Sequence, residues 1–194
     1  ATTVASELRK AGYVTAMAGK WHLGCWEPDP SGKRGPARLG FDEYLSCRID
    51  EESVKSRHAP GRGNPYWKTR LIHNNRDQAA LESQHSEQAF LDFSIDFLRK
   101  HRDRPFFLHH ASLLAHRPFV RVASPAPEDF NQNGKLRHFG PMLTRLDEVV
   151  GALRADAGLG GAPGEVEAGQ RVAEAHDVGE VEPGSVDDAA VVAR

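Results

Sequence analysis

The sequence predicts an α/β fold: a partial mixed or parallel sheet flanked by helices, followed by a disordered C-terminal tail. Two segments support this prediction, because each has the pattern of an amphipathic helix, a turn and then a short buried strand. They cover residues 3–18 and 86–112. Beyond Phe139 there is no aromatic residue, and beyond Lys135 no lysine. We therefore expect an ordered part over residues 1–158 and an atypical, poorly ordered tail over 159–194.

The first segment begins with a capped helix. Thr3 stands at the N-cap position, the helix is expected to end near Ala11, and Gly12 occupies the place of a C′ residue. Residues 13–18 follow with the composition of a largely buried strand. Its carboxyl end is the position where ligands bind in open α/β sheets.

Lys20 and His22 lie just past that predicted strand. Residues two apart in an extended segment point to the same side, so both can reach one site while Trp21 points into the core. An ammonium group and an imidazole are suited to an anionic ligand. The alternative interpretation, from spacing alone, is a solvated lysine and a hydrogen-bonded core histidine.

The second segment repeats this order. Ser86 is the expected N-cap of a helix with basic residues in its last turn, and residues 106–112 form the next strand. His116 lies past the end of that strand and is the third candidate for a site. His109 and His110 are adjacent on the strand and therefore face opposite ways. A third helix is expected over residues 141–153, whereas the stretch from Cys25 to Asn75 is expected to be loop-rich.

Composition limits the possible partners. The 194 residues carry a formal net charge of -2, which gives no reason to expect a nucleic acid or an anionic membrane surface. No apolar run approaches the roughly 20 residues of a membrane span. Cys25 and Cys47 are too few for a disulfide framework and are expected to be thiols. Because the chain begins at Ala1, we expect its true N-terminus to lie upstream, and the sequence leaves the localisation open.

The sequence contains no metal-ligand spacing of the HxxxH or CxxC kind, no GxSxG motif and no glycine-rich phosphate loop. The acidic pair near the end of the tail is expected to be solvated rather than to hold a cation. The residues alone therefore indicate an α/β unit with an anion-binding edge.

Four motifs in order resemble those of the type I sulfatases of the alkaline-phosphatase-like superfamily. The stretch from Gly12 to Gly24, GYVTAMAGKWHLG, is similar to the second sulfatase signature. GFDEY at 40–44, PFFL at 105–108 with AHRP at 115–118, and LDEVVG at 146–151 are similar to further family motifs. The resemblance covers residues 1–158 and implies a fragment of an alkaline-phosphatase-like core.

This resemblance implies hydrolysis of a small-molecule or glycan sulfate ester by a formylglycine nucleophile beside a Ca²⁺ ion. It also implies roles for three residues. Lys20 would contact the formylglycine hydroxyl and sulfate oxygens, His22 would orient the geminal diol and help collapse the hemiacetal, and His116 would hydrogen-bond the sulfate.

The sequence departs from the family pattern at several points. The formylglycine motif is Cys/Ser-x-Pro/Ala-x-Arg, and the residues after Cys25 and Cys47 do not fit it. We expect the nucleophile and the first metal aspartates to lie upstream of the chain. The later SDNG-like strand is replaced by Gly160–Gly164, which suggests that the tail is frameshifted or an unrelated fusion. Ala115 replaces the proline of the family's APH motif.

Two alternatives remain open. One is a phosphomonoester, phosphodiester or phosphonate hydrolase of the same superfamily. The other is a non-catalytic anion-binding remnant. Under the leading interpretation, this chain alone is expected to be inactive, because it lacks the nucleophile and the metal ligands.

Overall fold

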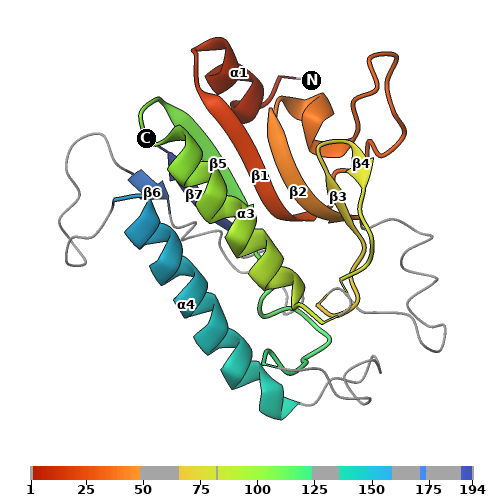
Figure 1. The fold of residues 1–194 in the computed structure, drawn as a ribbon, viewed down its shortest axis with the longest axis vertical. Helices are drawn as coiled ribbons and strands as arrows, with labels where there is room; N and C mark the ends of the chain where they lie inside the picture. The colour runs from red at the N-terminus through yellow and green to blue at the C-terminus, as the bar shows by residue number, and fades with distance from the viewer. Residues whose placement is uncertain are drawn as a thin grey trace, which may run out of the picture.

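In the computed structural model, the described residues are 2–48, 66–81, 83–123, 136–158, 171–173 and 189–193. They form a seven-stranded mixed sheet with the order β4-β3-β2-β1-β5-β7-β6 (Figure 1). The predicted α/β class is therefore confirmed. The strands are β1 (Val14–Trp21), β2 (Glu43–Arg48), β3 (Leu71–His73), β4 (Arg76–Asp77), β5 (Phe106–Ala111), β6 (Arg171–Ala173) and β7 (Ala189–Ala193).

The centre of the sheet is parallel. Strand β1 pairs in parallel with β2 on one side and with β5 on the other, while every other pairing is antiparallel. Gly19 is in register with Ser46 of β2 and Ala111 of β5. The carboxyl ends of β1, β2 and β5 therefore meet at one edge of the sheet.

Each face of the sheet is covered by a different set of elements. Helix α3 (Ser86–His101) packs on the sheet, and α4 (Phe139–Asp156) packs against α3 (Figure 1). Alternate residues of β1, beginning with Val14 and Ala16, join the core between these helices and the sheet. The intervening residues Met17 and Trp21 pack on the opposite face with α1 (Val4–Lys10) and the 3₁₀ helix η1 (Gly35–Leu39).

The third helix, α4, is longer at both ends than the predicted 141–153. The caps of α1 and α3 follow the sequence with one exception. Thr3 forms a capping box with Ser6, and Gly12 has a φ of 92°, as expected for the residue after the C-cap. The exception is α3, whose N-cap is His85 rather than Ser86. The Nδ1 atom of His85 accepts the Glu87 N–H, so an imidazole replaces the expected hydroxyl.

The GFDEY motif joins η1 to β1 and α1. Gly40 has a φ of 105°, and a Cβ there would lie 2.5 Å from the Ser6 backbone nitrogen. A side chain would therefore separate the end of η1 from α1. The carboxylate of Asp42 accepts the backbone N–H and hydroxyl of Thr15, both at 3.0 Å. These contacts fix the entry into β2 against β1.

The stretch from Cys25 to Asn75 is more ordered than its prolines and glycines suggest. It contains η1, β2 and β3, although residues 49–65 lie outside the described part. The β3–β4 hairpin turns on Asn74 and Asn75, whose φ angles are 46° and 69°. Their side-chain oxygens accept the Tyr44 and Arg34 backbone N–H groups at 2.6 and 2.7 Å. Tertiary hydrogen bonds thus order a segment that lacks a periodic pattern.

The tail contributes two strands, which extend the sheet at the edge beyond β5. Strand β7 pairs antiparallel with β5, and β6 pairs antiparallel with β7. Within the tail these two segments are strands, because the open edge of β5 offers main-chain partners. The other positions of 159–194 lie outside the described residues.

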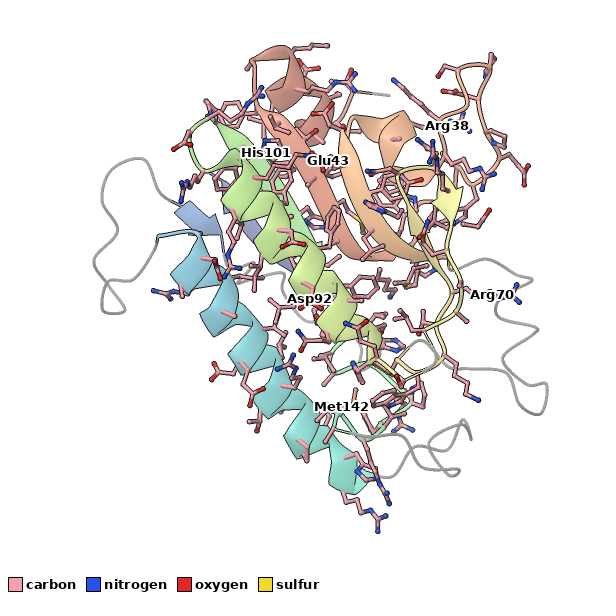
Figure 2. The ribbon with its side chains drawn as sticks, viewed as in Figure 1. Arg38, Glu43, Arg70, Asp92, His101 and Met142 are labelled. Atoms are coloured by element: carbon pink, nitrogen blue, oxygen red, sulfur yellow. The ribbon has the colours of Figure 1, made fainter. Side chains whose placement is uncertain are left out.

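An ionic contact ties the amino end of β2 to the last turn of α3. The Glu43 Oε1 atom lies 2.8 Å from Lys100 Nζ and 2.9 Å from His101 Nε2, and Figure 2 shows Glu43 beside His101. Burial raises the pKa of Glu43, but the bonds from Lys100 and His101 outweigh burial and lower it.

Among the described helices, none has the length and apolar character needed to cross a membrane.

Candidate functional site

Lys20 belongs to β1 itself. The strand extends to Trp21, so the predicted end at residue 18 is wrong, because pairing with β2 continues through Lys20 and Trp21. Lys20 is half-buried. Its register partner is Cys47, which lies in a core cluster with Ala18, Leu113 and Leu114. Strand alternation places Lys20 on the face of Ala18, under the loop that follows β5.

Gly19 allows this end of β1 to approach β5 closely. Its φ is 107°, and a Cβ there would lie 1.9 Å from the Ala111 carbonyl oxygen. The Ser46 hydroxyl donates to the Gly19 carbonyl at 2.8 Å. A backbone without a side chain is therefore required immediately before Lys20.

His22 lies on a short turn directly after β1. Trp21 is buried, as predicted, and its indole N–H donates to the Gly24 carbonyl at 2.9 Å. Its ring also meets Phe41 edge-on, with the ring centroids 6.2 Å apart. The side chain of His22 is exposed on this closed turn. The buried Trp21 ring thus lies between two accessible polar side chains, those of Lys20 and His22.

His116 lies on the loop that follows β5, and its side chain is exposed. Its Nδ1 atom lies 2.7 Å from the Arg117 carbonyl oxygen, and its backbone N–H donates to the Leu113 carbonyl at 3.0 Å. The ring therefore uses Nδ1–H for the carbonyl and presents Nε2 outward. Since β1 and β5 are parallel, this loop and Lys20 occupy the same edge of the sheet.

The adjacent histidines of β5 face opposite sides, as predicted. His109 stacks near Phe41 on the face of α1, whereas His110 bonds to residues of α3. Neither belongs to the turn of His22 or the loop of His116. His110 instead forms part of a buried hydrogen-bonded group with Ser94 and Glu87.

Two buried side chains hold the loop of His116 and were not singled out from the sequence. Glu87 accepts the Leu113 N–H at 3.1 Å, and the Tyr66 hydroxyl lies 2.6 Å from the His116 carbonyl. Both residues are fully buried. The only sequence signal was a carboxylate in the first turn of an amphipathic helix, which ordinarily indicates a favourable helix dipole interaction.

Hydrogen bonds stabilise the negative charge of the buried Glu87 carboxylate. Burial raises the pKa of Glu87, but bonds from His110, Ser112 and Leu113 outweigh burial and lower it. Burial lowers the pKa of His85 to about 4, and within the described residues its Nε2 atom has no hydrogen-bond partner. The Glu87 carboxylate therefore stays ionised, whereas the His85 imidazole stays neutral.

The implied calcium ion and formylglycine do not fit the residues described here. Within the described ranges, no group of three His, Cys, Asp or Glu side chains could hold a metal ion. Neither Cys25 nor Cys47 forms a disulfide within the described residues, and Cys47 is buried. The residues that follow each cysteine do not fit the formylglycine motif, so neither is a formylglycine position.

Comparison with known proteins identifies the family. The family model described as Sulfatase matches residues 1–159. The chain belongs to the sulfatase family. It is 28% identical to arylsulfatase A of Homo sapiens over 173 residues, which are 80% of this chain and 32% of that protein.

Other sulfatases show similar agreement. N-acetylgalactosamine-6-sulfatase of Homo sapiens is 27% identical over 165 residues, covering 75% of this chain and 27% of the relative. Arylsulfatase G of Rattus norvegicus is 54% identical over 44 residues, covering 23% of this chain and 7% of the relative. The chain thus spans about a third or less of the length of these sulfatases.

Proposed function

We propose that this chain is part of a sulfuric ester hydrolase, in which Lys20 and His116 bind the sulfate group of a small-molecule or glycan sulfate ester and His22 handles protons beside it. The observation that carries the proposal is the position of Lys20. It lies on the sheet face covered by the loop of His116, at the common carboxyl edge of β1 and β5. Membership of the sulfatase family supports the choice of sulfate as the anion.

Lys20 and His116 supply the charge that such a reaction needs. Negative charge on the sulfate oxygens and the leaving group is stabilised by donors that are already in place before the reaction. Lys20 is fixed by the pairing of β1 with β2, and His116 by the hydrogen bonds that hold its loop. We assign sulfate binding to both residues.

His22 is assigned the proton transfers next to the sulfate. Its imidazole is exposed on the turn closed by the Trp21 indole, and an imidazole can act as a general acid or base towards a bound ligand. This role is consistent with the short distance along the chain to Lys20. The two groups would act on one ligand from the same end of β1.

The state of His116 controls its ability to bind an anion. Its Nδ1–H is directed to the Arg117 carbonyl, so Nε2 can donate to sulfate only when the ring carries both protons.

We place the formylglycine nucleophile and Ca²⁺ in the parent enzyme, in residues other than those described here. When bound, calcium would supply positive charge beside the sulfate. The residues of this chain would then orient the anion and handle its protons. No reaction step is assigned to Cys25 or Cys47.

The direct test is binding of inorganic sulfate to the 194-residue chain, followed by NMR of the histidine rings. We expect sulfate to shift the His22 and His116 signals, and Lys20→Ala to weaken binding about tenfold, which corresponds to one charge-assisted hydrogen bond. Lys10→Ala is the matched control, because Lys10 lies on α1 and pairs with Glu7.

Equal sulfate affinity in Lys20→Ala and the unmodified chain would contradict the proposal. Parallel titrations with phosphate separate the related chemistries. Clearly tighter binding of phosphate than of sulfate at the same residues would favour a phosphate ester hydrolase instead.

A further inference from the structure

Ser94, His110 and Glu87 are arranged like a hydrolytic triad. Ser94 Oγ lies 2.9 Å from His110 Nδ1, and His110 Nε2 lies 3.0 Å from Glu87 Oε1. However, the exposed fractions of these residues are 0%, 1% and 0%, so no substrate can reach the serine. The group therefore has a different use, which is indicated by the remaining contacts of Glu87.

The second carboxylate oxygen of Glu87 reaches the loop of His116. Oε2 accepts the backbone N–H of Leu113 at 3.1 Å, while Oε1 is occupied by His110. Ser112 also hydrogen-bonds this carboxylate, and its hydroxyl accepts the Leu114 N–H at 3.0 Å. A single buried carboxylate at the start of α3 thus fixes both the end of β5 and the beginning of the loop.

Tyr66 fixes the other end of the same short segment. Its hydroxyl oxygen lies 2.5 Å from the Leu113 carbonyl and 2.6 Å from the His116 carbonyl. The ring is fully buried and stacks on His85, with the centroids 5.3 Å apart. The Tyr66 carbonyl also accepts the Ser86 N–H at 2.8 Å, which attaches Tyr66 to the helix start that carries Glu87.

We propose that Glu87 and Tyr66 are positioning residues for His116. They clamp the backbone from Leu113 to His116 between two buried polar side chains, so that the imidazole is presented in one orientation to the anion. This inference rests on the proposed function only in taking sulfate as the ligand. Glu87 and Tyr66 act through the loop backbone and do not touch the anion.

The experiment compares three variants of the 194-residue chain by amide hydrogen exchange and sulfate titration. Glu87→Gln should speed exchange of the Leu113 amide about tenfold or more, and Tyr66→Phe should do the same for the His116 amide. Each should weaken sulfate binding severalfold while leaving exchange in α4 unchanged. A purely structural role would not lower sulfate affinity without a global change in exchange.

Asp92→Asn is the matched control, because it also changes a carboxylate to an amide on α3 (Figure 2). Asp92 is exposed and accepts side-chain hydrogen bonds from Gln84 and Gln88. We expect this variant to leave both the loop exchange and the sulfate affinity at the level of the unmodified chain.

The unmodified chain provides a measurement that does not depend on folding of the variants. Its Leu113 and His116 amides should exchange as slowly as the amides of α3, because one hydrogen-bonded unit holds them. Rapid exchange of these two amides would overturn the proposal. Unchanged exchange and sulfate affinity in a folded Tyr66→Phe chain would also overturn it.

Failure of the proposed function gives a different result. If sulfate does not bind the unmodified chain, the assignment of sulfate to this edge fails, whereas the loop exchange in the variants still decides whether Glu87 and Tyr66 position His116.

Discussion

Glu87 accepts the backbone N–H of Leu113, 26 positions later in the sequence, and also bonds the ring of His110, 23 positions later. The carboxylate is completely buried, yet hydrogen bonds lower its pKa in spite of burial. It therefore remains an acceptor-only group and can hold a donor from β5 and a donor from the loop at the same time. The start of α3 and the loop of His116 become one structural unit.

Gly19→Ala should destabilise the chain severely. The new Cβ would meet the Ala111 carbonyl oxygen at 1.9 Å, and the φ of 107° is unfavourable for alanine. We expect a loss of about 3 kcal/mol or more in the free energy of unfolding, measured by urea denaturation. Gly12→Ala is the control, since Gly12 also has a positive φ but has no atom within 4 Å of the built Cβ.

The comparison between the two glycines separates strain from collision. Gly12→Ala should cost about 1 kcal/mol, which is the penalty of the left-handed backbone alone. Equal losses in the two variants would mean that the close approach of β1 and β5 at Gly19 is not required.

His85 should make the chain less stable in mild acid. Burial, with a contribution from Arg145, lowers its pKa to about 4 from 6.5. Below pH 6.5 the His85 ring binds a proton in the unfolded chain but not in the folded chain. The free energy of unfolding therefore falls as the pH falls from 6.5 towards 4. Between about pH 7 and about pH 5 this group alone should cost about 2 kcal/mol.

His85→Asn tests this origin, because an amide oxygen can still accept the Glu87 N–H without titrating. Urea denaturation at both pH values should show a smaller loss of stability in the variant than in the unmodified chain. The same loss in both would assign the acid sensitivity to other groups.

Trp21→Phe should loosen the turn that carries His22. The variant keeps an aromatic ring in the core but loses the donor to the Gly24 carbonyl, at a cost of about 1 kcal/mol. Amide exchange of residues 22–24 should increase, and sulfate affinity should fall about threefold as the ordering cost moves to the binding step. Unchanged exchange in this turn would show that the indole bond does not order it.

The 194-residue chain should not turn over an aryl sulfate, even with added calcium. It offers Lys20, His22 and His116, but neither cysteine has the flanking residues of a formylglycine site. Absorbance or fluorescence of the released phenol provides the measurement. Robust calcium-dependent hydrolysis by the purified chain would contradict the view that other residues supply the nucleophile.

Local patterns predicted the elements whose order is set by their own sequence. Thr3 and Gly12 marked the ends of α1, and an amphipathic pattern with basic residues in the last turn marked α3, because caps and helical periodicity are local signals. The end of β1 was misplaced because Gly19 resembles a strand terminus. Pairing with Cys47 and Arg48 continues the strand, and that pairing is not visible in the sequence of β1.

The candidate site divides in the same way. Lys20, His22 and His116 could be proposed from their places after strands and from the family motifs. Their positions at one sheet edge agree with the parallel order of β1 and β5, but their roles remain predictions. Tyr66 and Glu87 could not be identified from the sequence. Their role depends on contacts with Leu113 and His116, which are distant from them along the chain.

The two asparagines of the β3–β4 hairpin limit how this protein can be redesigned. Substituting glycine for Asn75 would give the Asn-Gly pair preferred in two-residue hairpins, which a consensus design would select. Yet that substitution would remove the oxygen that receives the Arg34 N–H at 2.7 Å. The turn with the better local preference would then make the fold less stable, since the hairpin asparagines connect β2 to the residues that lead into η1.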